Sequence, residues 1–89
     1  MKTITLDLAH MQSMSALHNY LRSVLALPVY YGANLDALYD CLTELDAATE
    51  LVVPAAIADE AHLGWYGEQL LQVLQDAAEE NEALTVTIR

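Results

Sequence analysis

The sequence predicts a small α/β fold, in which a three-stranded parallel sheet packs on about four helices. Its 89 residues are the length of one domain. Apolar and polar residues alternate near both ends of the chain, and a short apolar run lies near its middle, as in strands. Helical spacing of apolar residues fills the intervals, and strands joined by helical crossovers form parallel sheets. We expect one domain over residues 1–89, in the order β, α, α, β, α, α, β.

The first half of the chain is expected to hold one strand and two helices. The segment TITLDL, residues 3–8, alternates polar and apolar residues and predicts the first strand. Apolar residues then recur at helical spacing over 13–27, and Pro28 ends that helix. A second helix is expected at 34–43, where Asn34 is a suitable N-cap.

The second half is expected to mirror this pattern. The apolar segment ELVVP, residues 50–54, predicts a strand that is buried on both faces. Pro54 suits the first turn of a third helix over 55–63. The longest helical pattern covers 67–81, and the chain closes on an alternating strand at 83–89.

The net charge of the protein limits the classes of molecule that it is expected to bind. Thirteen acidic residues against three Lys and Arg residues give a net charge of −10. Such a surface repels nucleic acid and anionic membranes, whereas it attracts basic proteins and speeds their approach. We therefore expect no direct binding to nucleic acid or membrane. Two interpretations of the charge stay open: it favours a basic protein as partner, or it only keeps the protein soluble.

Segments that would direct the chain out of the cytoplasm are not expected. The longest uncharged apolar run, LVVPAAIA, is much shorter than the ~20 residues of a membrane-spanning helix. The first ten residues, MKTITLDLAH, lack the pattern of a signal peptide. Cys41 is the only cysteine and cannot form an internal disulfide. These features predict a cytoplasmic protein, and no motif predicts a cofactor.

The helix expected at 34–43 has an unusual polar face. On a helical projection, one side carries four apolar residues, and the other side carries Asp36, Tyr39, Asp40 and Thr43. Asp36 and Asp40 form a like-charge pair at i, i+4, which costs a helix ~0.2–0.5 kcal/mol. Aromatic side chains such as Tyr39 are enriched at protein interfaces. Two interpretations stay open: a binding face, and an acidic face that is merely solvated.

Two neighbouring features extend this face. In the motif YYG, Gly32 permits a tight turn, and one of Tyr30 and Tyr31 is expected in the core while the other is exposed. Asp76 belongs to a second acidic cluster near the end of the last helix, where the helix dipole disfavours anions. A solvated helix end is the alternative interpretation of that cluster.

The segment LPVYYGANLDALYDCLT resembles the loop and second helix of the barstar family, intracellular inhibitors of a secreted bacterial ribonuclease. The segments SALHNYL, LLQVLQDAAEE and TVTI fit the family pattern in the same order, so the resemblance covers nearly the whole chain. It implies a three-stranded parallel sheet packed on helices. It also implies a one-to-one complex with a basic ribonuclease, in which the acidic helix occupies the enzyme's active site where the RNA phosphates would bind.

The resemblance also implies roles for individual residues. Asp40 would be the central phosphate mimic, Asp36 would meet an arginine at the edge of the active site, and Tyr30 would pack on the catalytic histidine. Asp76 would be a second acidic anchor. The full set of expected contact residues is Tyr30, Gly32, Asn34, Leu35, Asp36, Tyr39, Asp40, Thr43, Glu44, Leu45 and Asp76.

The chain departs from the best-known family member at four of these positions. Tyr39 stands in place of a tryptophan, Glu44 and Leu45 in place of a glycine and a tryptophan, and Asp76 in place of a glutamate. These changes bear on which ribonuclease is bound and how tightly. A fold retained for a different basic protein or nuclease is therefore the main alternative.

Other functions fit the sequence less well. Paired carboxylates can serve in acid–base catalysis, but no nucleophile and base stand together, so we expect no enzyme. A metal site at Asp36 and Asp40 would need a third and a fourth ligand, to which the sequence does not point. An acyl carrier would need a serine after Asp36, where this chain has Ala37.

Overall fold

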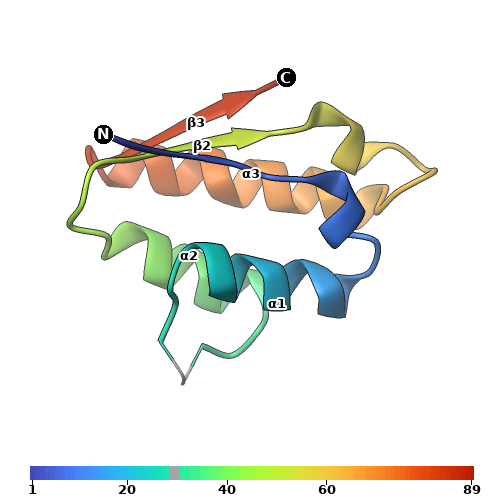
Figure 1. Cartoon of the computed structure of the whole chain (residues 1–89), viewed down its shortest axis with the longest axis horizontal. Helices are drawn as coiled ribbons and strands as arrows, with labels where there is room; N and C mark the ends of the chain where they lie inside the picture. Colours follow the sequence, from blue (N-terminus) through green and yellow to red (C-terminus); the bar gives the residue numbers. More distant parts are fainter. Residues whose placement is uncertain (29–30) are drawn as a thin grey trace.

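The three strands form one parallel sheet, and the α-helices lie on one side of it (Figure 1). This computed structural model describes residues 1–28 and 31–89. Two short 3₁₀ turns, η1 and η2, accompany the strands and helices. The elements are β1 (Lys2–Thr5), η1 (Leu8–His10), α1 (Met14–Val24), α2 (Leu35–Thr43), β2 (Thr49–Val53), η2 (Ala55–Ala58), α3 (Trp65–Glu80) and β3 (Leu84–Ile88).

The sheet has the order β1-β2-β3, so the predicted three-stranded parallel sheet is confirmed. In its register Ile4 pairs with Leu51, and Leu51 pairs with Val86. The central strand β2 is the most deeply buried, with Leu51 and Val53 wholly inaccessible to solvent. Glu50 is the half-buried exception, and its carboxylate accepts hydrogen bonds from the hydroxyls of Thr3 and Thr87 on the two edge strands.

The prediction of a helix over residues 55–63 is wrong. Only the 3₁₀ turn η2 forms there, so the described residues hold three α-helices instead of about four. Asp59 ends the turn in an extended conformation, and its carbonyl accepts the amides of His62 and Gly64. The chain therefore turns back on itself after η2. Ile57 is fully buried, so a compact turn satisfies the apolar pattern that suggested a helix.

Helices α2 and α3 pack together beneath the sheet and supply much of the core. Leu38 and Leu42 of α2 and Leu70 and Leu74 of α3 are all fully buried. Burying such a side chain contributes about 1.5–3 kcal/mol. The packing holds α2 with its apolar face inward, and this fixes which side chains it offers to a partner.

Candidate functional site

The start of α2 is defined by Asn34. Its side-chain oxygen accepts the amide of Ala37 at 2.8 Å, which confirms the predicted N-cap. Its side-chain nitrogen donates to the carbonyl of Gly32 at 3.2 Å. One side chain thus joins the loop before α2 to the first turn of the helix, and both segments belong to the expected contact surface.

The two aspartates of α2 lie on its solvent side. Asp36 and Asp40 are exposed, whereas Leu38 and Leu42 on the opposite side are completely buried. Leu35 is half-buried, as is Thr43, whose hydroxyl donates to the carbonyl of Asp40 at 2.9 Å. The helical projection therefore separates the exposed carboxylates from the core correctly.

Tyr39 is half-buried and packs against the core, so it is less exposed than its position on the polar face predicts. The pKa of its phenol is raised by partial burial and then by the carboxylates of Glu80, Asp76 and Asp40. Two of these carboxylates belong to α3 and one to α2. The acidic clusters that are separate in the sequence thus converge around one tyrosine.

Cationic side chains are absent from both helices that form this surface. Together α2 and α3 carry six carboxylates and no Lys, Arg or His. Asp76 is exposed, and its carboxylate accepts a hydrogen bond from the side chain of Gln72 at 2.8 Å. We name the residues Asp36, Tyr39, Asp40, Asp76 and Glu80 the acidic face. Its charges have no counter-ion on their own helices.

The far end of the acidic face is held by a residue that the sequence did not single out. Asn81 caps the end of α3, and its side-chain nitrogen donates to the carbonyls of Leu42 at 2.9 Å and Leu45 at 3.0 Å. Its side-chain oxygen accepts the amide of Ala83 at 2.9 Å. These bonds fix the turn that carries exposed Glu44 and half-buried Leu45. No local pattern shows that Asn81 reaches α2.

Replacing Asn81 with alanine should lower the free energy of unfolding by about 1–3 kcal/mol, because two carbonyls and an amide lose their partner. Chemical denaturation of the variant and the wild type measures this. Asn19 is exposed on α1, so the matched change Asn19→Ala should shift stability by about 0.5 kcal/mol or less. Equal stability of both variants would contradict a structural role for Asn81.

Two pockets lie beside the second half of α2, and Asp40 lines one of them. One, of about 310 Å³, is lined by Tyr31, Ala37, Asp40, Cys41 and Glu44. The other, of about 280 Å³, shares Cys41 and Glu44 and continues toward the segment after α1. Cys41 is half-buried, and burial followed by the charges of Glu44 and Asp40 raises the pKa of its thiol. The thiolate form is therefore disfavoured, as suits a packing role.

Of the two adjacent tyrosines before α2, the structure describes Tyr31. Tyr31 is buried, with 4% of its surface exposed. Burial, followed by Tyr66 and Cys41, raises the pKa of its phenol to about 12, so the hydroxyl keeps its proton. Tyr30, the residue expected to contact the enzyme's histidine, lies outside the described residues. The expectation that one of the pair enters the core is met by Tyr31.

His18 of α1 is the only buried histidine among the described residues, with 3% of its surface exposed. Its two ring nitrogens lie within hydrogen-bonding reach of the Tyr31 and Tyr66 hydroxyls. A neutral imidazole, with one donor and one acceptor, satisfies both contacts. His18 is therefore a core residue whose two ring nitrogens both have partners.

Stability should fall as the pH falls through 6.5, because burial lowers the pKa of His18 below that ordinary value. In this range the unfolded chain binds a proton that the folded chain does not, which favours unfolding. Urea unfolding near pH 7.5 and near pH 5.5 measures the change. The variant His18→Gln should lose less stability over this interval than the wild type, while His62→Gln, at an exposed position, should behave as the wild type.

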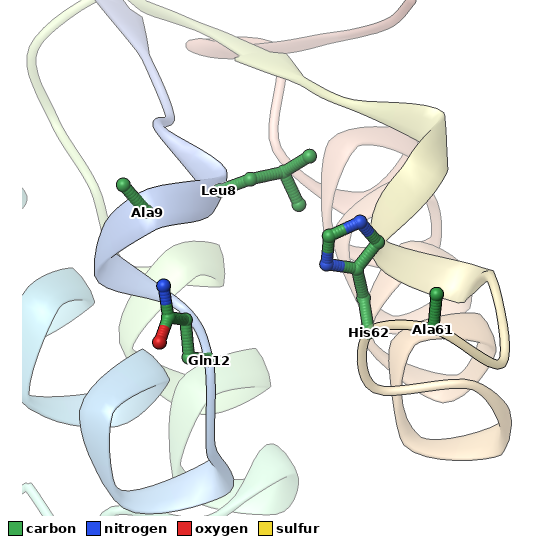
Figure 2. A pocket seen from close by; sticks show the side chains of 5 residues that line it. All are labelled: Leu8, Ala9, Gln12, Ala61 and His62. Carbon is green, nitrogen blue, oxygen red and sulfur yellow. The ribbon is translucent and has the colours of Figure 1, made fainter.

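A further pocket has no residue of the acidic face in its lining. It has a volume of about 420 Å³ and is lined by Leu8, Ala9, Gln12, Ala61 and His62. Figure 2 shows Gln12 on the wall formed by the segment after η1, and His62 across from it on the turn that follows η2. Over residues 1–28 and 31–89, no group of three or more His, Cys, Asp or Glu side chains is placed to hold a metal. No helix in this part of the chain is long and apolar enough to cross a membrane.

Comparison with known proteins agrees with this architecture. The family described as "Barstar (barnase inhibitor)" matches residues 1–89. A protein of Bacillus subtilis (strain 168), named "Putative ribonuclease inhibitor YrdF", is 40% identical over 81 residues, which cover 90% of this chain and 89% of the relative. A match over the whole chain and a relative of this similarity establish the family. This chain belongs to the barstar family.

Proposed function

We propose that this protein inhibits a ribonuclease by covering the enzyme's active site with α2 and the loop before it. Ribonuclease inhibition in general is supported by the family and by the name of the related protein. The binding mode rests on the acidic face. It is the part of the described surface whose chemistry complements a site that binds RNA.

The observation that carries the proposal is the convergence of carboxylates from two helices. Asp36 and Asp40 are exposed on α2, which packs against α3, and the carboxylates of Asp40, Asp76 and Glu80 all raise the pKa of the Tyr39 phenol. A ribonuclease stabilises phosphate charge with fixed cationic side chains, so it presents a cationic cleft. Carboxylates can pair with those cations without offering a bond that the enzyme can cleave.

Long-range charge favours the same partner. The net charge of −10 attracts a basic enzyme and speeds association, although salt screens this effect. The complex would hold one inhibitor and one enzyme molecule, since a single acidic face would fill a single active site. A cytoplasmic inhibitor would protect the cell's own RNA from the enzyme, and that location stays a prediction.

The proposed contacts include both ends of α2. Gly32, Asn34 and Leu35 would contact the enzyme before and at the start of the helix, and Thr43, Glu44 and Leu45 at its end. Tyr30 remains part of the proposed set. Glu44 is exposed and adds a carboxylate beside the pocket next to Asp40. The preferred enzyme should therefore present a cationic or polar group opposite Glu44.

A second candidate is a barstar-fold binding protein whose target is another basic protein or nuclease. The turn after α2 favours it, because Leu45 is half-buried against the core and Glu44 is exposed. This turn offers a charge to a partner instead of a large aromatic ring. The two candidates differ only in the identity of the partner.

Calorimetric titration against a panel of small secreted guanyl-specific ribonucleases, with a parallel RNA-cleavage assay, tests the proposal. We expect tight one-to-one binding to at least one enzyme and loss of its cleavage activity. A folded protein that binds none of them would overturn the proposal in favour of the second candidate. Binding without loss of cleavage would contradict the active-site mode.

A further inference from the structure

We propose that His18 and Tyr31 are positioning residues that hold residues 31–34, the segment before α2, in their binding conformation, through a chain of hydrogen bonds to Tyr66. This inference rests on the proposed function, because that segment is part of the proposed contact surface. Neither His18 nor Tyr66 would touch the enzyme. Their contribution to affinity would arise from order in the free inhibitor.

This chain of hydrogen bonds joins three parts of the fold. His18 lies on α1, Tyr31 on the segment before α2, and Tyr66 in the first turn of α3. The Tyr31 hydroxyl contacts Nδ1 of His18, and the Tyr66 hydroxyl lies 2.6 Å from Nε2. The Tyr31 ring is thereby tied to two helices that belong to the rigid core.

Arg22 holds the same tyrosine by its backbone. One guanidinium nitrogen donates to the Tyr31 carbonyl at 3.1 Å, and the guanidinium lies 5.8 Å from the centre of the Tyr31 ring. The Tyr31 amide donates to the carbonyl of Pro28 at 2.9 Å. Tyr31 is therefore fixed through its hydroxyl, its ring and both of its backbone polar groups.

Three residues connect Tyr31 to the start of α2. Gly32 follows Tyr31, and its carbonyl accepts the side chain of Asn34, which caps α2. Between them Ala33 has φ 53°, a left-handed conformation that is strained for a residue other than glycine. Such a conformation persists only where its neighbours hold it in place. Loss of the contact between the Tyr31 hydroxyl and His18 would weaken the hold of one of those neighbours.

Core packing alone does not require this arrangement. His18 and Tyr31 are buried and Tyr66 is half-buried, so these polar side chains lose hydration, whereas apolar residues of similar volume would fill the space at no such cost. A satisfied polar chain specifies one orientation of its members, whereas apolar contacts tolerate several. An inhibitor whose loop is ordered before binding loses less conformational entropy in the complex. The polar chain therefore fits a positioning role.

The experiment compares Tyr31→Phe with Tyr20→Phe, both measured against the ribonuclease that the wild type binds best. Each change removes one hydroxyl. The Tyr20 hydroxyl accepts a hydrogen bond from the amide of Asp7 at 3.1 Å, and it does not belong to the hydrogen-bonded chain of Tyr31, His18 and Tyr66. We expect Tyr31→Phe to bind about tenfold more weakly, mostly through faster dissociation. Tyr20→Phe should bind as the wild type, even where the two variants are equally destabilised.

Hydrogen exchange in the free protein supplies a readout that needs no partner. Amides of Tyr31 through Asn34 should exchange faster in Tyr31→Phe, while the amides of β2 keep their protection relative to global stability. His18→Leu should have the same effect, and His18→Gln should restore part of the protection, because its amide supplies a donor and an acceptor. A uniform change across all amides would overturn the proposal.

The outcomes separate this inference from the proposed function. Unchanged affinity in Tyr31→Phe, with a wild type that binds tightly, would overturn the positioning role and leave the proposed function standing. A wild type that binds no ribonuclease would overturn the proposed function. The exchange measurements alone would then decide whether His18 and Tyr31 order this segment.

Discussion

Replacing Asp40 with alanine should weaken binding to the target ribonuclease by about 2–5 kcal/mol and leave the fold intact. This is the general range for removing one partner of a hydrogen-bonded charge pair that an interface buries. Measurements on complexes of the barstar family are among those behind the range. Asp40 is exposed on α2, and its charge acts on the Tyr39 phenol together with those of Asp76 and Glu80 of α3, so it should meet a cationic part of the enzyme's site.

Stability should not suffer from the same change. Asp40 is exposed, and its removal relieves the like-charge pair with Asp36 and the charge beside Tyr39. We expect the free energy of unfolding to change by about 0.5 kcal/mol or less, or to rise. Unfolding of Asp40→Ala would contradict the placement of this side chain at the surface.

Calorimetry of Asp40→Ala and Asp59→Ala against the same enzyme measures the effect. Asp59 is exposed in the turn after η2, so both variants lose one negative charge but only one loses a contact on the acidic face. Asp59→Ala should change binding by about 0.5 kcal/mol or less. Equal losses in the two variants would mean that net charge, not the acidic face, determines affinity.

Replacing Gly67 with alanine should lower the free energy of unfolding by about 3 kcal/mol or more, the upper range for overpacking a core. A Cβ at this position would lie 1.9 Å from the carbonyl oxygen of Ile57 and 2.9 Å from the Cα of Ala58. These are backbone atoms, which cannot turn away as the end of a side chain can. The first turns of α3 would have to separate from η2.

This result would oppose what the helix alone favours. Within an isolated helix, alanine is about 1 kcal/mol more favourable than glycine. Urea unfolding of Gly67→Ala and Gly32→Ala tests the argument, since a Cβ at Gly32 would meet the movable side chain of Asn34 at 3.0 Å. The change at Gly32 should therefore cost much less. A variant at Gly67 as stable as the wild type would show that α3 and η2 do not approach so closely.

Features that depend on a residue and its near neighbours in the sequence were predicted correctly. The alternation of apolar residues predicted the first and third strands, and Asn34 was predicted as the N-cap of α2. The helical projection separated exposed Asp36 and Asp40 from buried Leu38 and Leu42. Each of these follows from a repeat of two or 3.6 residues, or from one local hydrogen bond.

The segment after β2 shows where local patterns fail. Residues 55–63 have helix-forming composition, but the chain makes only η2 and a turn. The close approach of Gly67 to the Ile57 carbonyl depends on where α3 lies. A short segment gains little from helix propensity, so such contacts between elements decide its conformation.

By itself the sequence determined the parallel α/β fold, the family, and the helix whose two aspartates face solvent. Only the tertiary structure decided that α3 brings Asp76 and Glu80 to Tyr39, that Asn81 holds the turn after α2, and that Tyr31 joins His18 in the core. The physical reason is that periodicity assigns a side chain to one face of its own element. Which faces then meet depends on how the apolar sides of separate elements pack, and that packing joins residues such as His18 and Tyr66, which are 48 positions apart.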